Sequence, residues 1–274
     1  MQALTPLRVR GHVVKESTME YNDRYTPFFR RAGLLPFVTV ARRGMPTYNA
    51  PALTALVDRW RPETHTFHLP CGEMTVTLED VAMITALPIA GDAVCGRIEP
   101  GRFRDMVEHL LGVRPAEAEE GRKAAKTGGL AFAWLREHFR ILPEGANAIT
   151  TERYARAYLL YVFGAVLFPD GGGDSASWMF LPLLANWDNC RGYSWGSAAL
   201  AFLYRQLDEA CRRSSANSNL GGCVLLLQVY VDIQHVKVCY HHLQHLYIYI
   251  YVPFISGLDV GEGSNWTADE QDTA

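Results

Sequence analysis

Lysine is scarce in this chain of 274 residues, which contains only Lys15, Lys123, Lys126 and Lys237. An enzyme that uses pyridoxal phosphate needs a positioned lysine for its Schiff base, together with a cradle for the phosphate. The four lysines fall in a loose N-terminal stretch, a charged loop and the C-terminal tail, where no buried pocket is expected. We therefore expect neither transamination nor a bound cofactor.

Other motifs that carry chemistry are also missing. The chain has no P-loop, GxGxxG or HExxH motif, and its six cysteines include neither a CxxC pair nor a spacing typical of zinc sites. No N-terminal signal peptide is evident, so the cysteines are expected to be reduced thiols in an intracellular protein. No apolar run reaches the roughly 18 residues that span a bilayer. These absences predict a soluble protein with no membrane contact, no metal site and no enzymatic activity.

Composition and charge are those of an ordinary globular domain. Hydrophobic residues make up 49% of the chain and charged residues 20%, which is enough apolar material for a sizeable core. The formal net charge of −3 argues against a surface built wholly for phosphate backbones. A focused arginine surface would still allow binding to chromatin or nucleic acid, and its candidate residues are Arg97, Arg102, Arg104 and Arg122.

The most informative stretch runs from residue 60 to residue 87. Apolar spacing predicts a helix over residues 51–60, which ends there because the residue before Pro62 disfavours helical geometry. Residues 64–69 and 73–77 are then predicted to be two strands, joined by a tight turn at Pro70-Cys71-Gly72. The stretch therefore indicates a β-hairpin between two helices.

The pairing of this hairpin is specified by its own side chains. With Pro70 and Cys71 as the loop, His68 faces Glu73 and Phe67 faces Met74, so that Phe67, Met74 and Val76 share one face. A slip of one residue would mix apolar and polar side chains on both faces. An isolated hairpin is only marginally stable, so the neighbouring helices are expected to cover its apolar face.

Helix boundaries elsewhere are predicted from capping residues. Thr77, with Asp80 three residues later, is typical of an N-cap, and Thr150 is predicted to begin a long helix with Ile149 and Tyr154 as a hydrophobic staple. That helix, residues 151–168, is apolar nearly all round from Tyr158 onward, which indicates a central buried position. Other helices are predicted before Gly33, before Gly112, over residues 130–139 and after Ser194.

These elements predict one mainly α-helical domain with a small β-hairpin at about residues 64–77 packed between helices. The domain is assigned to residues 21–231. Residues 1–20 are expected to be a poorly ordered lead-in, and residues 232–274 an atypical, partly disordered tail.

Residues 55–82, ALVDRWRPETHTFHLPCGEMTVTLEDVA, resemble the signature of the plant mobile domain, a family also called aminotransferase-like that includes the maintenance-of-meristems proteins. Two later stretches are similar to the same family. They are Trp187-Asp188 with Tyr193-Ser194-Trp195-Gly196-Ser197-Ala198, and Gly221-Gly222-Cys223 with Leu225-Leu226-Leu227-Gln228. The resemblance covers roughly residues 20–230 of the chain.

The resemblance implies a non-enzymatic nuclear protein-interaction module with roles in meristem maintenance, genome integrity and transposon silencing. It also implies a protein partner, of which a phosphatase-like protein is the expected kind. The sequence after about Val231 is unlike the family, which fits either translation through an intron or a truncated copy derived from a transposable element. The family-motif residues that would form an interaction surface are Trp60, Arg61, His65, His68, Cys71, Glu73 and Trp195.

One pair of residues allows a competing, enzymatic interpretation. His68 and Glu73 face each other in the predicted register and would be an acid–base pair. The sequence identifies no third group to orient them, so an exposed cross-strand pair worth roughly 0.2–1 kcal/mol is the favoured interpretation. Stacking of nucleic-acid bases on tryptophan is likewise weighed against packing in a helical core, and the core is favoured for Trp60, Trp134, Trp187 and Trp195.

Overall fold

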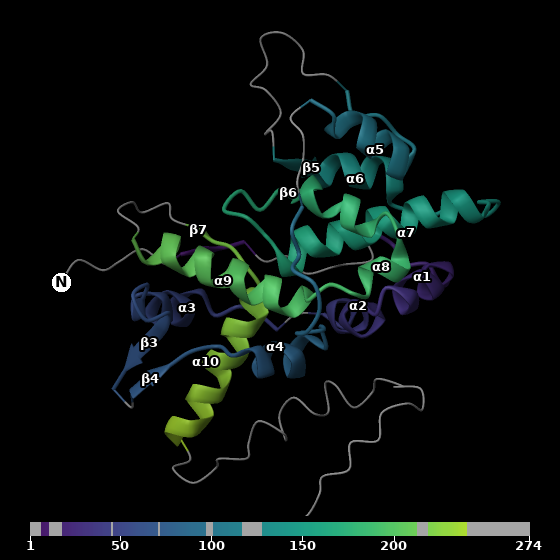
Figure 1. Cartoon of the computed structure of the whole chain (residues 1–274). Coiled ribbons are helices and arrows are strands. Elements are labelled where there is room, and N and C mark those ends of the chain that lie inside the picture. The colour runs from purple at the N-terminus through teal and green to yellow at the C-terminus, as the bar shows by residue number, and fades with distance from the viewer. Residues whose placement is uncertain are drawn as a thin grey trace, which may run out of the picture.

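A computed structural model describes residues 7–10, 18–44, 46–70, 72–96, 101–116, 128–212 and 219–239, with residues 233–239 described by their backbone only. The described chain is mainly α-helical with three small sheets, as predicted (Figure 1). The α-helices are α1 (Thr26–Arg31), α2 (Leu35–Arg42), α3 (Ala50–Val57), α4 (Leu78–Thr85), α5 (Phe103–Leu111), α6 (Phe132–Phe139), α7 (Ala148–Val162), α8 (Trp187–Cys190), α9 (Trp195–Cys211) and α10 (Val224–Cys239).

The remaining elements are short. Three 3-10 helices, η1 (Asp23–Tyr25), η3 (Trp178–Phe180) and η4 (Pro182–Leu184), and one π-helix, η2 (Phe163–Leu167), are described. The strands are β1 (Arg8–Val9), β2 (Trp60–Arg61), β3 (Thr66–Leu69), β4 (Gly72–Met74), β5 (Gly129–Ala131), β6 (Ser175–Ser177) and β7 (Asn219–Leu220). Strands β2, β3 and β4 form the three-stranded sheet, whose order follows the chain.

Helix α7 and the π-helix that continues it form the centre of one half of the molecule. Every residue from Ala155 to Phe168 is buried, which confirms the central position predicted from the apolar sequence. Helices α5 and α6 and the η1 segment pack against this axis. Because the helix is surrounded by protein on all sides, any polar side chain along it must find its partners inside the core.

The other half is built around α9, which packs against α4, α3 and β2. Helix α10 lies against α3 and α4 beside the three-stranded sheet (Figure 1). The buried apolar side chains of both halves belong to one continuous cluster. The predicted capping box is present, since the Thr77 side chain accepts from the Asp80 backbone and the Asp80 carboxylate accepts from the Thr77 backbone.

Several predicted helix boundaries are wrong. Helix α3 ends at Val57 rather than at residue 60, because Trp60 and Arg61 are extended and pair with β3. Helix α7 is capped by Asn147, whose side chain accepts from the Thr150 backbone, so Thr150 lies inside the helix. The predicted staple residue Ile149 is 63% exposed.

The segment predicted as a helix over residues 130–139 begins with a strand, β5, which pairs with β6. Ser194 occupies the N-cap of α9, but its hydroxyl donates to the Ser197 hydroxyl and accepts from no backbone N–H of the helix. At the two ends of the domain, β1 pairs with β7, and α10 continues past Val231 to Cys239.

A candidate interaction surface on the β-ribbon

The three-stranded sheet at residues 60–74, here called the β-ribbon, has the register that the side-chain pattern predicted. Phe67 pairs with Met74, His68 with Glu73 and Leu69 with Gly72. The sequence did not predict the third strand, β2, in which Trp60 pairs with Phe67. This strand adds a second hydrogen-bonded partner to β3 and fixes the β-ribbon to the end of α3.

One face of the β-ribbon is sealed against the core. Trp60, Phe67 and Val76 are 1%, 0% and 1% exposed, and the ring centroids of Trp60 and Phe67 are 4.8 Å apart. The ring of Tyr230 on α10 lies 6.1 Å from that of Phe67. The apolar face is therefore buried, but the helices that contact it include α9 and α10, which are not the sequence neighbours that the prediction named.

Helix α9 fastens the β-ribbon through polar contacts as well. The indole Nε1 of Trp60 donates to Oδ1 of Asp208 at 2.7 Å, and the Tyr204 hydroxyl donates to the Val76 carbonyl at 2.7 Å. The Thr75 hydroxyl lies 2.8 Å from the same Tyr204 oxygen. Because Trp60 is almost fully buried, its N–H needs this carboxylate as a partner.

His65 lies at the seam between the β-ribbon and α9. Its imidazole stacks on the Tyr204 ring with 5.4 Å between centroids, and its Nε2 is 3.4 Å from Oδ2 of Asp208. The backbone of His65 has a φ of 53°, in the left-handed region. The Thr75 hydroxyl donates to the His65 carbonyl at 2.8 Å, so three contacts hold this residue in place.

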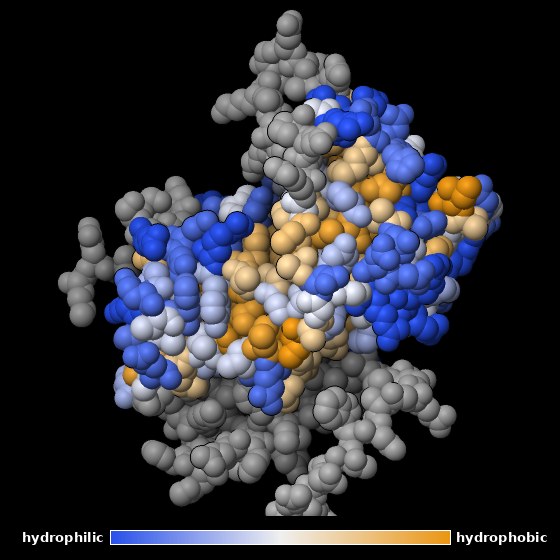
Figure 2. Space-filling view, viewed as in Figure 1, coloured by the Kyte–Doolittle hydropathy of each residue, from blue (hydrophilic) through white to orange (hydrophobic). Residues whose placement is uncertain are grey.

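The opposite face of the β-ribbon carries a chain of polar side chains, Thr64, Thr66, Glu73 and His68, here called the ribbon surface. The Thr64 and Thr66 hydroxyl oxygens are 2.6 Å apart, and Thr66 donates to Oε2 of Glu73 at 3.1 Å. Nε2 of His68 is 3.4 Å from Oε1 of Glu73. The region over β3 and β4 is mostly hydrophilic in Figure 2, whereas apolar residues gather nearer the middle of the molecule.

The His68–Glu73 pair is open to solvent, with 41% and 55% of the two side chains exposed. Solvent screens such a pair, so it adds little to stability. No described side chain orients the His68 imidazole from its other nitrogen, as a catalytic dyad requires. The geometry thus offers hydrogen-bond acceptors and donors to another molecule more readily than it offers acid–base chemistry.

The other predicted surface residues are divided between core and exterior. Trp60 and Trp195 are buried and cannot contact a partner, whereas Arg61 is exposed and donates to the Trp60 carbonyl. Cys71 lies outside the described residues.

Of the four arginines proposed for nucleic-acid binding, Arg97 and Arg122 lie outside the described residues. Arg104 lies over the ring of Phe103, 5.0 Å from its centroid. The side chains of all four lysines, Lys15, Lys123, Lys126 and Lys237, also lie outside the described part. The structure therefore does not test the arginine surface or the lysine argument.

The second family stretch is structural. The indole of Trp195 donates to the Cys190 carbonyl at 2.9 Å, and the backbone N–H of Gly196 donates to the Pro88 carbonyl at 2.8 Å. A Cβ on Gly196 would lie 2.8 Å from the Ile89 side chain. Glycine at residue 196 therefore lets the start of α9 approach the segment that follows α4.

The sequence interpretation overlooked that Gly192-Tyr193-Ser194-Trp195-Gly196 matches GxSxG, the nucleophile elbow of α/β-hydrolases. In that motif the serine is exposed on a strained turn beside a histidine. Here Ser194 is 7% exposed, has a relaxed φ of −81°, and donates to the Ser197 hydroxyl at 2.6 Å. The geometry of Ser194 is therefore not that of a nucleophile elbow.

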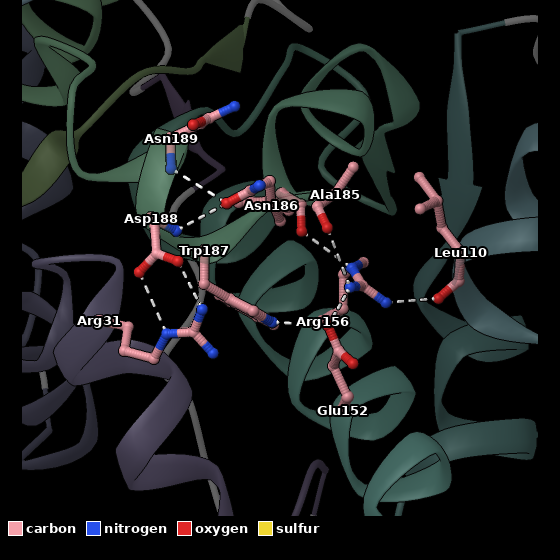
Figure 3. A network of polar contacts seen from close by, with 10 residues as sticks. Arg31, Leu110, Glu152, Arg156, Ala185, Asn186, Trp187, Asp188 and Asn189 are labelled. Carbon is pink, nitrogen blue, oxygen red and sulfur yellow. Dashed lines mark hydrogen bonds and ion pairs between the residues drawn. The ribbon is translucent and has the colours of Figure 1, made fainter.

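Trp187 of the same stretch belongs to a polar network around Arg156, and the adjacent Asp188 accepts hydrogen bonds from Arg31 (Figure 3). Arg156 is 5% exposed and donates to the carbonyls of Leu184 at 2.9 Å and Leu110 at 2.7 Å. Its Nη2 is 2.8 Å from the Glu152 carboxylate, which also accepts from the Trp187 indole at 2.9 Å. Burial lowers the pKa of Arg156, and the Glu152 charge opposes that shift.

Two further kinds of site are absent from the described residues. No group of three or more His, Cys, Asp or Glu side chains is arranged to hold a metal ion in the described ranges. Among the same residues, no helix combines the length and apolar character needed to cross a membrane.

The class of protein defined by these features is a helical domain whose signature stretch forms a β-ribbon, sealed on one face and polar on the other. The chain belongs to the plant mobile domain family, whose model matches residues 37–239.

Its curated relatives are Arabidopsis thaliana proteins. The chain is 41% identical to "Protein MAIN-LIKE 1" over 81% of its own length and 42% of that protein, and 41% identical to "Protein MAINTENANCE OF MERISTEMS" over 68% and 37%. It is 43% identical to "Serine/threonine-protein phosphatase 7 long form homolog" over 65% of the chain and 13% of that protein. The chain thus spans less than half the length of these relatives. No solved structure matches it.

Proposed function

We propose that this chain is a non-enzymatic protein-interaction module that acts in the nucleus, in meristem maintenance, genome integrity and transposon silencing. The ribbon surface is the contact region, and the partner is a phosphatase-like protein. The names of the relatives support the biological setting, since one is called MAINTENANCE OF MERISTEMS and another is named as a phosphatase.

The observation that carries the proposal is the division of the signature stretch into two faces. Trp60 and Phe67 anchor the β-ribbon in the core, and α9 fastens it through Asp208 and Tyr204. Polar side chains on the other face are consequently held at fixed positions without being buried. A preorganised surface loses little conformational freedom on binding, which favours affinity.

The charges of this region indicate the chemistry of the partner. Glu73 is contacted by Thr66 and His68, and the Asp208 carboxylate by Trp60 and His65. Within the described residues, neither carboxylate is paired with an arginine or a lysine. A partner segment that offers positive charge and hydrogen-bond donors would form ion pairs and hydrogen bonds with the Glu73 and Asp208 carboxylates.

Affinity purification from plant nuclei tests the proposal. The wild-type chain is expected to recover a phosphatase-like protein, and the double variant His68→Ala with Glu73→Gln is expected to recover it at least tenfold less efficiently. The matched control is Arg31→Ala with Asp188→Asn, which removes another exposed ion pair, outside the β-ribbon. Repeated recovery of the wild-type chain alone, or equal losses in both double variants, would contradict the proposal.

A further inference from the structure

His65 has an unusual backbone conformation for its residue type. Among the described residues, His65 and Ala86 are the only ones other than glycine with a positive φ, of 53° and 55°. Ala86 is the C-cap of α4, where a left-handed residue commonly ends a helix. His65 closes the turn between β2 and β3, where glycine or asparagine adopts this conformation more easily.

The imidazole of His65 is not needed to fill the core or to fasten the β-ribbon. Its side chain is 49% exposed. The rings of Trp60 and Tyr204 already contact each other, with 5.2 Å between centroids, and Trp60 holds Asp208 directly. Glycine would satisfy the turn at lower conformational cost, so the packing does not explain a histidine at this position.

The surroundings nevertheless fix the orientation of the ring. Asp208 faces Nε2 at 3.4 Å, and Tyr204 stacks on one side at an interplanar angle of 17°. A carboxylate beside one ring nitrogen favours the proton there, which leaves Nδ1 as a hydrogen-bond acceptor in the neutral ring. The Thr75 hydroxyl, which donates to the His65 carbonyl, fixes the backbone of the same residue.

We propose that His65 is a specificity-determining contact residue at the edge of the ribbon surface and that its Nδ1 accepts a hydrogen bond from the partner. Asp208 is then a positioning residue, which sets the tautomer and direction of the imidazole. This inference rests on the proposed function and extends the contact region from the ribbon surface to the seam with α9.

The first test is independent of any partner. ¹⁵N NMR of the full chain labelled in its histidines, with His65→Gly used to assign the signal, is expected to show the Nε2–H tautomer at neutral pH. In Asp208→Asn the signal should move toward the tautomer mixture of a free imidazole. An Nδ1–H tautomer in the wild-type chain, or no change in the variant, would overturn the inference.

The second test separates recognition from folding. The protein recovered from plant nuclei by the wild-type chain is purified and titrated against His65→Gly and against Ala86→Gly, the matched control at the other positive φ. In both variants glycine replaces a residue held at a positive φ and so removes the same backbone strain, and the Tm of neither variant should fall. His65→Gly alone should weaken binding at least tenfold.

The outcomes distinguish this inference from the proposal on which it depends. A lower Tm for His65→Gly with unchanged affinity would show that the imidazole serves the fold, which overturns the inference only. Loss of binding in the His68/Glu73 double variant with full binding in His65→Gly would also overturn only the inference. A wild-type chain that captures nothing overturns both.

Discussion

Two contacts between a carboxylate and a basic side chain occupy opposite environments in this protein. Arg156 is enclosed between α5, α7 and α8, where its guanidinium donates to two main-chain carbonyls and to the half-buried Glu152 (Figure 3). His68 and Glu73 meet on the ribbon surface, with roughly half of each side chain in solvent. Both regions contain residues of the family stretches, but the two pairs differ in how much of each side chain remains in water.

The difference follows from the cost of burying charge. A guanidinium removed from water must regain its hydrogen bonds within the protein, so Arg156 takes two main-chain carbonyls as well as Glu152. Such a network joins segments that are far apart in sequence, and each nitrogen of the Arg156 guanidinium already donates to a protein group. An exposed pair keeps water as a partner and can exchange that water for another protein.

The largest expected loss of stability follows from substitution of the buried arginine, Arg156. Arg156→Met leaves the carbonyls of Leu184 and Leu110 without this donor and leaves the Glu152 carboxylate with only the Trp187 indole, which should lower the free energy of unfolding by about 3–5 kcal/mol. Chemical denaturation measures this loss. The same experiment on Arg31→Ala, which removes an exposed arginine, should give a much smaller change. Equal losses would show that burial does not govern these contacts.

The two tryptophans that donate to carboxylates sharpen the comparison. Trp60→Phe and Trp187→Phe each remove one indole N–H, facing Asp208 and Glu152 respectively. Each should cost about 1–3 kcal/mol, since a carboxylate loses a donor and the core loses volume. The loss should be greater for Trp187→Phe, because Glu152 also holds the buried Arg156. Differential scanning calorimetry of both variants measures which substitution lowers stability more.

The exposed pair should matter little for stability. His68→Ala with Glu73→Gln is expected to change the free energy of unfolding by less than about 1 kcal/mol, because cross-strand pairs in solvent contribute little. A greater loss in urea denaturation would mean that the β-ribbon depends on this pair. Its reduced binding in the purification experiment could then no longer be assigned to recognition.

The smallest expected effect depends on pH. Arg31 lowers the pKa of Asp188 below its ordinary value of 3.8 through a hydrogen bond. The carboxylate therefore stabilises the fold above its ordinary pKa, and this contribution is lost as the pH falls through the lowered value. Asp188→Asn should be slightly less stable than the wild type at neutral pH, and the two should converge in acid. A difference in unfolding midpoint that persists at low pH would contradict this assignment.

Local patterns predicted the register of the hairpin and the start of α4, the helix that follows it. His68 faces Glu73 because alternation of apolar and polar residues permits one pairing, and Thr77 caps α4 because Asp80 can return the hydrogen bond. Asn147 is an equally local signal for the start of α7, but the apolar neighbours of Thr150 also fit a hydrophobic staple, so the sequence pattern favours the wrong cap. Strand β2 was missed because Trp60 also suits the helical spacing that precedes it.

The sequence by itself determined the family, the mainly helical class, the hairpin and the side of it that would be buried. These depend on neighbours a few residues apart, whose geometry the chain fixes locally. Only the tertiary structure decided which carboxylate receives the Trp60 indole, which carbonyls accept from Arg156, and that His65 stacks on Tyr204. Those partners are far apart in sequence and become neighbours only when packing of the helices brings them together.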